Sequence, residues 1–291
     1  MKPTVALVLG SGGARGLAHI GVIHELINQG YEISSISGSS IGALIGGVYA
    51  TGKLDEFESW ICSLSKMDVF NLVDFTLSTQ GIIKADRVLK EMQKFIPDQN
   101  IENMAIKFSA VTTDIKNKKE VVITQGSLYE AIRASISIPM VITPIHKIDT
   151  LFVDGGVLNP VPVNRVSRQK KDILIAVNLN SNIPYKKPTI VYPDKGFLEK
   201  LTRSKLIGFQ RNLAILFPGN KKENMGYFNL IGVTTSLMLL QIAKLTLELN
   251  PPDLLIEISR ESCGIFDFYK ANELIELGMK VTMDGLNKLS K

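Results

Sequence analysis

The chain has 291 residues, 45% of them apolar and 21% charged, which is the composition of an ordinary globular protein with room for a large core. The net charge of +5 fits an anionic membrane or a nucleic acid as partner, and it fits equally well a simple excess of solvated lysines. Two cysteines exclude a disulfide framework, and no histidine or cysteine has metal-site spacing, so we expect a cytoplasmic protein without metal or cofactor.

The first 50 residues alternate between short apolar strands and helices. Strands are expected at residues 5–9 and 33–37, and helices at residues 17–28 and 41–50. The run at 5–9 is shorter than the roughly 7–15 apolar residues of a secretory signal, so we interpret it as a buried strand. This alternation predicts an α/β protein with a mainly parallel central sheet and helices on both faces, a three-layer α/β/α sandwich.

Further elements follow in the rest of the chain. Helical patterns are expected at residues 53–66 and 85–95, from residue 127, and from about residue 268; strands are expected at residues 106–114, 121–124, 151–153, 173–177 and 254–258. The most apolar helical pattern, at 237–249, is interrupted by Gln241, Lys244 and Glu248. No segment therefore approaches the roughly 20 uncharged residues of a membrane-spanning helix.

Residues 185–222 differ from the rest of the chain in composition. They contain nine Lys or Arg and two acids, Asp194 and Glu199, interleaved with bulky apolar residues. We interpret residues 185–235 as an excursion from one domain that spans residues 1–291. The interleaving is typical of interfacial segments and predicts peripheral contact with an anionic membrane rather than with nucleic acid. An ordinary helical excursion packed on the core is an equal alternative, and the sequence indicates no oligomeric state.

The stretch Gly38-Ser-Ser-Ile-Gly42 matches the G-x-S-x-G nucleophile elbow, with Ser40 at its centre. The pattern alone also fits a plain Gly/Ser loop. Here an apolar strand precedes it and a helix of small residues follows, which is the context that the elbow requires. The helix N-terminus would favour negative charge that develops at the serine.

A second glycine-rich stretch, from Gly10 to Gly16, precedes the first helix. Its backbone amides suit an anion, either the oxyanion of a tetrahedral intermediate or a dinucleotide pyrophosphate. The spacing Gly10-x-Gly12-x-x-x-Gly16 is not G-x-G-x-x-G, and no acid ends the second strand, so nucleotide binding is the weaker reading.

The third candidate is Asp154, which follows an apolar strand and precedes two glycines. Taken alone, such a sequence is more often a turn. A Ser-acid-His triad would need a histidine after Asp154, but the three histidines, His19, His24 and His146, all precede it. We therefore expect a Ser–Asp dyad in which no histidine takes part.

Together these motifs resemble those of the patatin-like phospholipases, specifically the bacterial branch. Ser11-Gly-Gly-Ala-Arg-Gly16 is similar to the oxyanion loop of that family, Gly38-Ser-Ser-Ile-Gly42 to its elbow, and Asp154-Gly-Gly156 to its catalytic Asp motif, in the same order and spacing. Residues 133–139, 159–162 and 270–278 also look like the family, whereas residues 185–235 carry none of its motifs. Ser11 stands where many members have glycine.

The resemblance implies a patatin-like fold and hydrolysis of an acyl ester, most of all of a phospholipid or lysophospholipid. By this resemblance Ser40 is the nucleophile and Asp154 the proton acceptor. The oxyanion would be held at Gly12, Gly13 and Ala14, with Arg15 fixing the loop or adding charge, and Gly38, Gly42, Gly155 and Gly156 complete the motifs. The alternative is a non-catalytic regulatory or scaffolding protein of the same fold that binds an acyl ligand or a protein partner. The complete set of motifs argues against that alternative.

Overall fold

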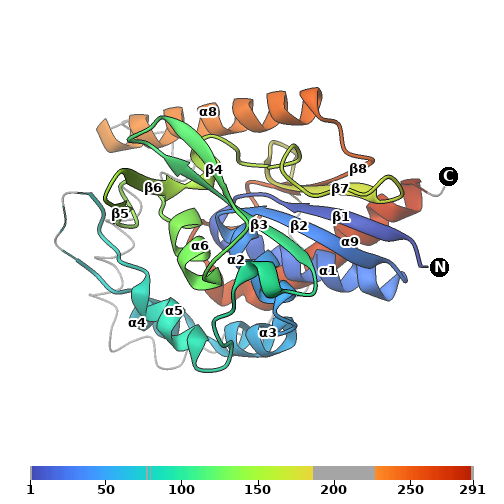
Figure 1. The fold of residues 1–291 in the computed structure, drawn as a ribbon, viewed down its shortest axis with the longest axis horizontal. Coiled ribbons are helices and arrows are strands. Elements are labelled where there is room, and N and C mark those ends of the chain that lie inside the picture. Colours follow the sequence, from blue (N-terminus) through green and yellow to red (C-terminus); the bar gives the residue numbers. More distant parts are fainter. Residues whose placement is uncertain (1, 77, 79, 186–226, 290–291) are drawn as a thin grey trace.

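The computed structural model describes residues 2–76, 78, 80–185 and 227–289. In this part of the chain an eight-stranded sheet forms the centre of the molecule (Figure 1). Its strands are β1 (Thr4–Leu9), β2 (Glu32–Ser39), β3 (Lys107–Asp114), β4 (Lys119–Ile123), β5 (Ile145–Lys147), β6 (Thr150–Asp154), β7 (Ile173–Ser181) and β8 (Leu254–Ser259).

The helices connect these strands and cover the sheet. They are α1 (Ala18–Asn28), α2 (Ile41–Ala50), α3 (Leu54–Ser63), α4 (Lys66–Leu72), α5 (Asp86–Gln93), α6 (Leu128–Ser135), α8 (Tyr227–Leu249) and α9 (Ala271–Leu289). Single 3₁₀ turns lie at η1 (Gly13–Leu17), η2 (Ile101–Asn103), η3 (Gly155–Val157) and η5 (Phe268–Lys270).

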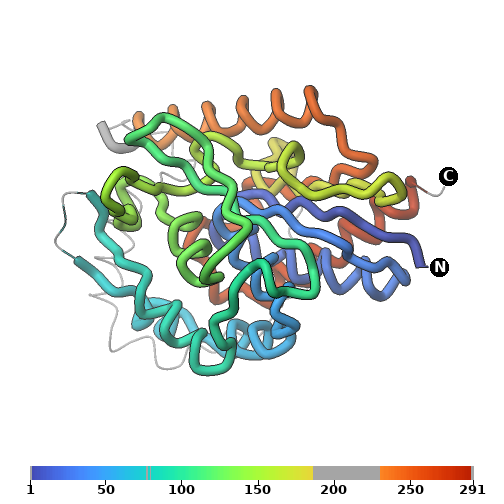
Figure 2. The backbone as a smooth tube through the Cα atoms, viewed as in Figure 1, coloured from blue at the N-terminus to red at the C-terminus, as the bar shows by residue number. Residues whose placement is uncertain are grey.

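Hydrogen bonds connect the strands in the order β5-β6-β3-β2-β1-β7-β8, and β4 also pairs with β3. The parallel part of the sheet consists of β3, β2, β1, β7 and β8. Strands β4 and β6 run antiparallel to β3. The mainly parallel sheet expected from the sequence is thus confirmed. Both chain termini lie at the end of the sheet where β1 begins (Figure 2).

Strand β1 shows how the two faces of the sheet are buried. Its alternate residues Val5, Leu7 and Leu9 join the large core that contains residues of α1, α2 and α9. Ala6 and Val8 point to the other face and join a smaller core with Ala243 of α8 and with the segment after η3. Figure 1 shows α1 and α9 on one side of the sheet and α8 across the other. The three-layer α/β/α arrangement is therefore confirmed.

Helix α8 is longer than the sequence predicted. Residues Leu230–Leu249 have a mean hydropathy of 1.6, so by length and composition alone this helix could cross a membrane. The expectation that no segment approaches this length is therefore wrong, because the apolar pattern begins at residue 230 and carries only two charges, Lys244 and Glu248. Only 6% of the window is buried, and Leu237 and Met238 are more than half exposed.

Two other local expectations differ from the structure. The helix predicted at 53–66 corresponds to α3, which ends at Ser63, and α4 was not predicted; Ser65 and Asp68 form the capping box that starts this second helix. The short strand β5 was not predicted; its three residues carry no strand pattern of their own and are ordered by pairing with β6. The predicted excursion at 185–235 lies largely outside the described residues.

Helices α1 and α9 approach each other closely through two glycines. A Cβ atom on Gly21 would lie 1.9 Å from the carbonyl oxygen of Ile275, and a Cβ atom on Gly278 would lie 2.0 Å from that of Ala18. In both cases the neighbour is backbone, which cannot rotate away. The close packing of α1 against α9 therefore requires glycine at both positions.

We predict that Gly278→Ala lowers the free energy of unfolding by at least about 1–3 kcal/mol, the usual cost of overpacking a core. Gly285 is the matched control on the same helix, because an added Cβ atom there would lie 3.4 Å from the side chain of Leu254. Gly285→Ala should be neutral or stabilise by up to about 1 kcal/mol, since alanine favours helix. Urea denaturation of both variants measures the difference, and equal losses would contradict the packing argument.

Candidate active site

Ser40 forms the sharp turn between β2 and α2. Its φ of 56° and ψ of −124° are unfavourable for a residue with a side chain. The flanking glycines make the turn feasible: a Cβ atom on Gly38 would lie 2.4 Å from the amide nitrogen of Ala43, and one on Gly42 would lie 2.0 Å from the carbonyl oxygen of Leu9. The G-x-S-x-G spacing thus has a steric origin at both glycines. The turn places the serine hydroxyl at the N-terminus of α2, beyond the carboxyl end of β2.

A buried serine supports this strained turn from the side. The backbone amide of Ser40 donates a hydrogen bond to Oγ of Ser135, at 2.9 Å. Ser135 in turn donates to the carbonyl oxygen of Val111 in β3, at 2.6 Å, and its side chain is fully buried. The last residue of α6 therefore links the elbow to the neighbouring strand.

Ser40 and Asp154 lie in direct contact. The hydroxyl of Ser40 donates to Oδ2 of Asp154 at 2.5 Å, and both side chains are 5% exposed or less. The other carboxylate oxygen, Oδ1, accepts a hydrogen bond from the amide of Gly156 at 2.7 Å. Each oxygen of the carboxylate thus has its own donor, which fixes the plane of the group toward the serine.

Strand pairing explains why these two residues meet although 114 positions separate them. Ala110 and Val111 of β3 pair with β2 on one edge and with β4 on the other, whereas residues Thr112–Asp114 pair with β4 and β6. Because a strand has only two edges, β6 must take over the edge that β2 leaves. Ser39 lies opposite Val111 and Asp154 opposite Thr112, the next residue along. The end of β2 and the end of β6 therefore meet head to head.

Burial changes the acidity of Asp154. The loss of solvent raises the pKa of its carboxyl to about 7, against the opposing effects of the hydrogen bonds from Ser40 and Gly156. An ordinary aspartate has a pKa of about 3.9 and is a weak base at neutral pH. The Asp154 carboxylate is therefore a much better proton acceptor than the residue type suggests.

Gly155 and Gly156 allow this close approach of β6 to the elbow. A Cβ atom on Gly155 would lie 2.1 Å from the carbonyl oxygen of Val111, and one on Gly156 would lie 3.0 Å from Oγ of Ser11. The second contact shows that the Asp154 turn and the glycine-rich loop after β1 touch each other. Three segments that are distant in the sequence therefore converge on Ser40.

Several amides of the glycine-rich loop are already used in backbone hydrogen bonds. The amides of Gly10, Ser11 and Ala14 donate to the carbonyl oxygens of Val177, Pro160 and Ile265. Within the described residues the amides of Gly12 and Gly13 have no acceptor. The expectation that the Ala14 amide also serves an anion is therefore not met, since its 2.9 Å bond to Ile265 already uses it.

The partners of Arg15 are residues other than Ser40 and Asp154. Its guanidinium donates to Oδ1 of Asn180 at 2.9 Å and to the carbonyl oxygens of Arg260 and Cys263. Asn180 also donates to the carbonyl oxygen of Ser11 at 2.6 Å. Of the two roles considered for Arg15, these contacts match fixing of the loop.

The three histidines have partners elsewhere. Nε2 of His19 lies 2.8 Å from the carbonyl oxygen of Gly10, and burial lowers the pKa of this ring to about 4, so the neutral ring donates to the loop. His24 contacts Glu58, and the exposed His146 contacts Gln80. His19 thus stabilises the start of the glycine-rich loop, which sequence reasoning did not predict.

His24, Asp55 and Glu58 place three potential metal-ligand atoms within 4.8 Å of one another. The sequence showed no such spacing, because the histidine is in α1 and the acids are in α3. Nothing else among the described residues points to a metal there, and the cluster contains no residue of the dyad.

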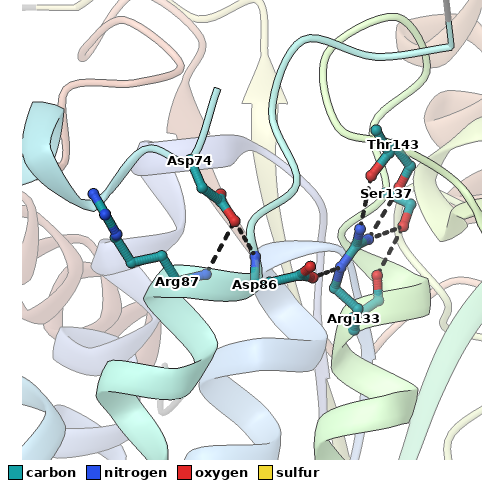
Figure 3. A network of polar contacts seen from close by, with 6 residues as sticks. All are labelled: Asp74, Asp86, Arg87, Arg133, Ser137 and Thr143. Carbon is teal, nitrogen blue, oxygen red and sulfur yellow. Dashed lines mark hydrogen bonds and ion pairs between the residues drawn. The ribbon is translucent and has the colours of Figure 1, made fainter. Parts of the chain in front are cut away.

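A buried arginine orders the segment that leads from α6 to β6 (Figure 3). Arg133 donates to Asp86, to Oγ of Ser137, and to both the carbonyl and the hydroxyl oxygen of Thr143. The carbonyl oxygen of Ser137 accepts the amide of Asp154 at 2.9 Å. Arg133 therefore supports the backbone on which the carboxylate is mounted, and no sequence spacing could have predicted these partners.

We predict that Ser135→Ala lowers the free energy of unfolding by about 1–3 kcal/mol, because the amide of Ser40 and the carbonyl of Val111 would both lose a buried partner. Ser63→Ala is the control, since Ser63 is exposed and bonds only to Trp60 in its own helix; its effect should stay within about 0.5 kcal/mol. Chemical denaturation gives both values. A neutral Ser135→Ala would mean that the elbow does not need this support.

Comparison with known proteins identifies relatives of this chain. The family model for the patatin-like phospholipases matches residues 7–166, which include the glycine-rich loop, the elbow and Asp154. An uncharacterized NTE family protein of Mycobacterium tuberculosis is 35% identical over 98% of this chain and 92% of its own length. Lysophospholipase NTE1 of Yarrowia lipolytica is 30% identical over 61% of this chain, which corresponds to 13% of that longer protein. Among solved structures, VipD from Legionella pneumophila aligns with a TM-score of 0.48 and 12% identity, over 99% of this chain and 67% of VipD. The chain belongs to the patatin-like phospholipase family.

Proposed function

We propose that this protein is a serine acyl ester hydrolase that acts on phospholipids or lysophospholipids through a Ser40–Asp154 dyad. Its family and the yeast lysophospholipases among its relatives support hydrolysis of lipids. The observation that carries the dyad is the 2.5 Å hydrogen bond from the serine hydroxyl to a buried carboxylate with a raised pKa.

The first half of the reaction forms an acyl-enzyme. Oγ of Ser40 attacks the ester carbonyl carbon while its proton passes to Oδ2 of Asp154. The carbonyl oxygen becomes an oxyanion, for which the free amides of Gly12 and Gly13 are the donors that we propose. As the bond to the leaving alcohol breaks, Asp154 returns the proton to the alcohol oxygen.

The second half releases the fatty acid. A water molecule attacks the acyl carbon and gives a proton to Asp154, and that proton returns to Oγ of Ser40 as the acyl bond breaks. A carboxylate with a pKa near 7 is suited to both directions of transfer, because neither its protonated nor its ionised form is strongly disfavoured at neutral pH.

We predict that Ser40→Ala and Asp154→Asn each lower the turnover of a soluble short-chain ester by about 10³-fold or more, because the two groups act as a unit. Ser63→Ala, at an exposed site, is the control and should keep normal turnover. A fluorophosphonate probe should label Ser40 in the wild type. A folded Asp154→Asn enzyme with near-normal rates would rule out the dyad. Labelling of Ser40 without turnover of any ester would favour the non-catalytic alternative.

We also predict the pH dependence of the reaction. Because the pKa of Asp154 is raised to about 7, the carboxylate required for proton transfer is lost as the pH falls below 7. The value of kcat/KM should therefore fall about tenfold per pH unit below pH 7 and be level above it. Initial rates from pH 5 to 9, with protein stability checked at each pH, measure this profile. A level profile down to pH 5 would contradict the raised pKa.

A further inference from the structure

Two hairpin turns lie side by side beyond the carboxyl end of β3. One turn joins β3 to β4 and the other joins β5 to β6. The side-chain amide of Asn117 in the first turn donates to the carbonyl oxygen of Asp149 in the second, and Nζ of Lys116 donates to that of Ile148. The buried carboxylate of Asp114 accepts the amides of Lys116, Asn117 and Leu151 and so ties the two turns together. The pair of turns is therefore a single rigid projection.

The surface of this projection is basic and apolar. We call it the basic rim, and it consists of the exposed residues Ile115, Lys116, Lys118, Lys119, Lys147 and Ile148. Ile148 is 94% exposed and Ile115 is 45% exposed. Two acids face the lysines: Asp149 lies 4.0 Å from Lys116, and Glu130 lies 3.2 Å from Lys147. Lys118 and Lys119 have no acidic partner among the described residues.

The basic rim lies at the same end of the sheet as the dyad, beyond the carboxyl end of β3. Ser39 is level with Val111, and β3 continues for three more residues to Asp114, which is about 10 Å at the usual rise per residue. Strand β6 runs back from the rim, at Thr150, directly to Asp154. A flat surface that touches the rim would therefore face the same edge of the molecule as the dyad.

We propose that the basic rim docks this protein on the surface of an anionic lipid bilayer. The substrate in that bilayer rests on the function proposed above, whereas the docking itself rests on the charges and the isoleucines. Lysines beside an exposed isoleucine suit a bilayer, because the cations contact anionic headgroups while the apolar tip enters the headgroup boundary. The dyad side of the sheet then faces the membrane.

The test is co-sedimentation of the full chain with vesicles of phosphatidylcholine, with and without phosphatidylglycerol. One variant carries Lys116→Gln, Lys118→Gln and Lys119→Gln, and a second carries only Ile148→Ser. The matched control carries Ile27→Ser, Lys107→Gln, Lys170→Gln and Lys171→Gln. These residues are exposed at the opposite end of the sheet, where the parallel strands begin. Ile27 is 45% exposed, like Ile115.

We expect the wild type to bind the anionic vesicles at least tenfold more tightly than the neutral ones, and less tightly in 0.5 M salt because salt screens the charges. The lysine variant should lose at least tenfold and the Ile148→Ser variant about threefold or more, while the control stays within twofold. Equal binding to neutral vesicles, or no binding, would overturn the proposal. Equal binding to neutral vesicles would indicate that the exposed apolar helix α8 binds the membrane instead. Retained binding by both rim variants, or an equal loss in the control, would also overturn it.

Hydrolysis of a soluble ester separates this proposal from the proposed function. All the variants should keep the soluble activity of the wild type, since none of the altered residues contacts the dyad. Vesicle binding that depends on the rim in a protein without any esterase activity would support the docking surface and refute the acyl hydrolase. Normal esterase activity without binding to vesicles would support the acyl hydrolase and refute the docking surface.

Discussion

The hydrogen bond from Ser40 to Asp154 depends on a single steric constraint, the positive φ of Ser40. A side chain at this backbone conformation is unfavourable, so the surrounding structure must hold it in place. Two glycines leave room for the turn, and Ser135 holds its amide. In return the hydroxyl stands clear of the strand and can point to a carboxylate. Relaxation of that one torsion would move the hydroxyl away from Asp154.

The carboxylate is placed by equally local means. Strand β6 ends where β2 ends, on the same edge of β3, and the amide of Asp154 is held by Ser137. Ser137 is held by Arg133, whose guanidinium also donates to Asp86 and Thr143. Ser135, Ser137 and Arg133 thus orient the backbone of Ser40 and Asp154 through short chains of hydrogen bonds.

The sequence predicted the parts of this site that consist of consecutive residues. The glycines around Ser40 and after Asp154 occupy fixed positions in short stretches of sequence, so a motif shows them even where the backbone atoms that they avoid, in Leu9 and Val111, are distant in the chain. Side-chain partners that are distant in the chain follow no such motif. Ser135 is 95 positions from Ser40, and no sequence pattern around Ser135 predicts their hydrogen bond. The loop amides illustrate this: those of Gly12 and Gly13 have no acceptor among the described residues, whereas the Ala14 amide is used by Ile265, which only the folded chain brings near. For the fold, apolar periodicity located the parallel strands and most of the helices, but not β5, whose order comes from pairing alone.

The glycine-rich loop depends on contacts that the ribosome completes late. The loop is near the N-terminus, yet it is fastened by residues close to the other end of the chain, since Ala14 bonds to Ile265 and Arg15 to Arg260 and Cys263. The ribosome makes Ser40 and Asp154 long before it makes these residues. The nascent chain therefore contains Ser40, Asp154 and the loop partners Pro160, Val177 and Asn180 before these last partners of the loop are made. The contacts of Ala14 and Arg15 with residues 260–265 can form only after translation has passed residue 265, when this segment packs against the loop that follows β1.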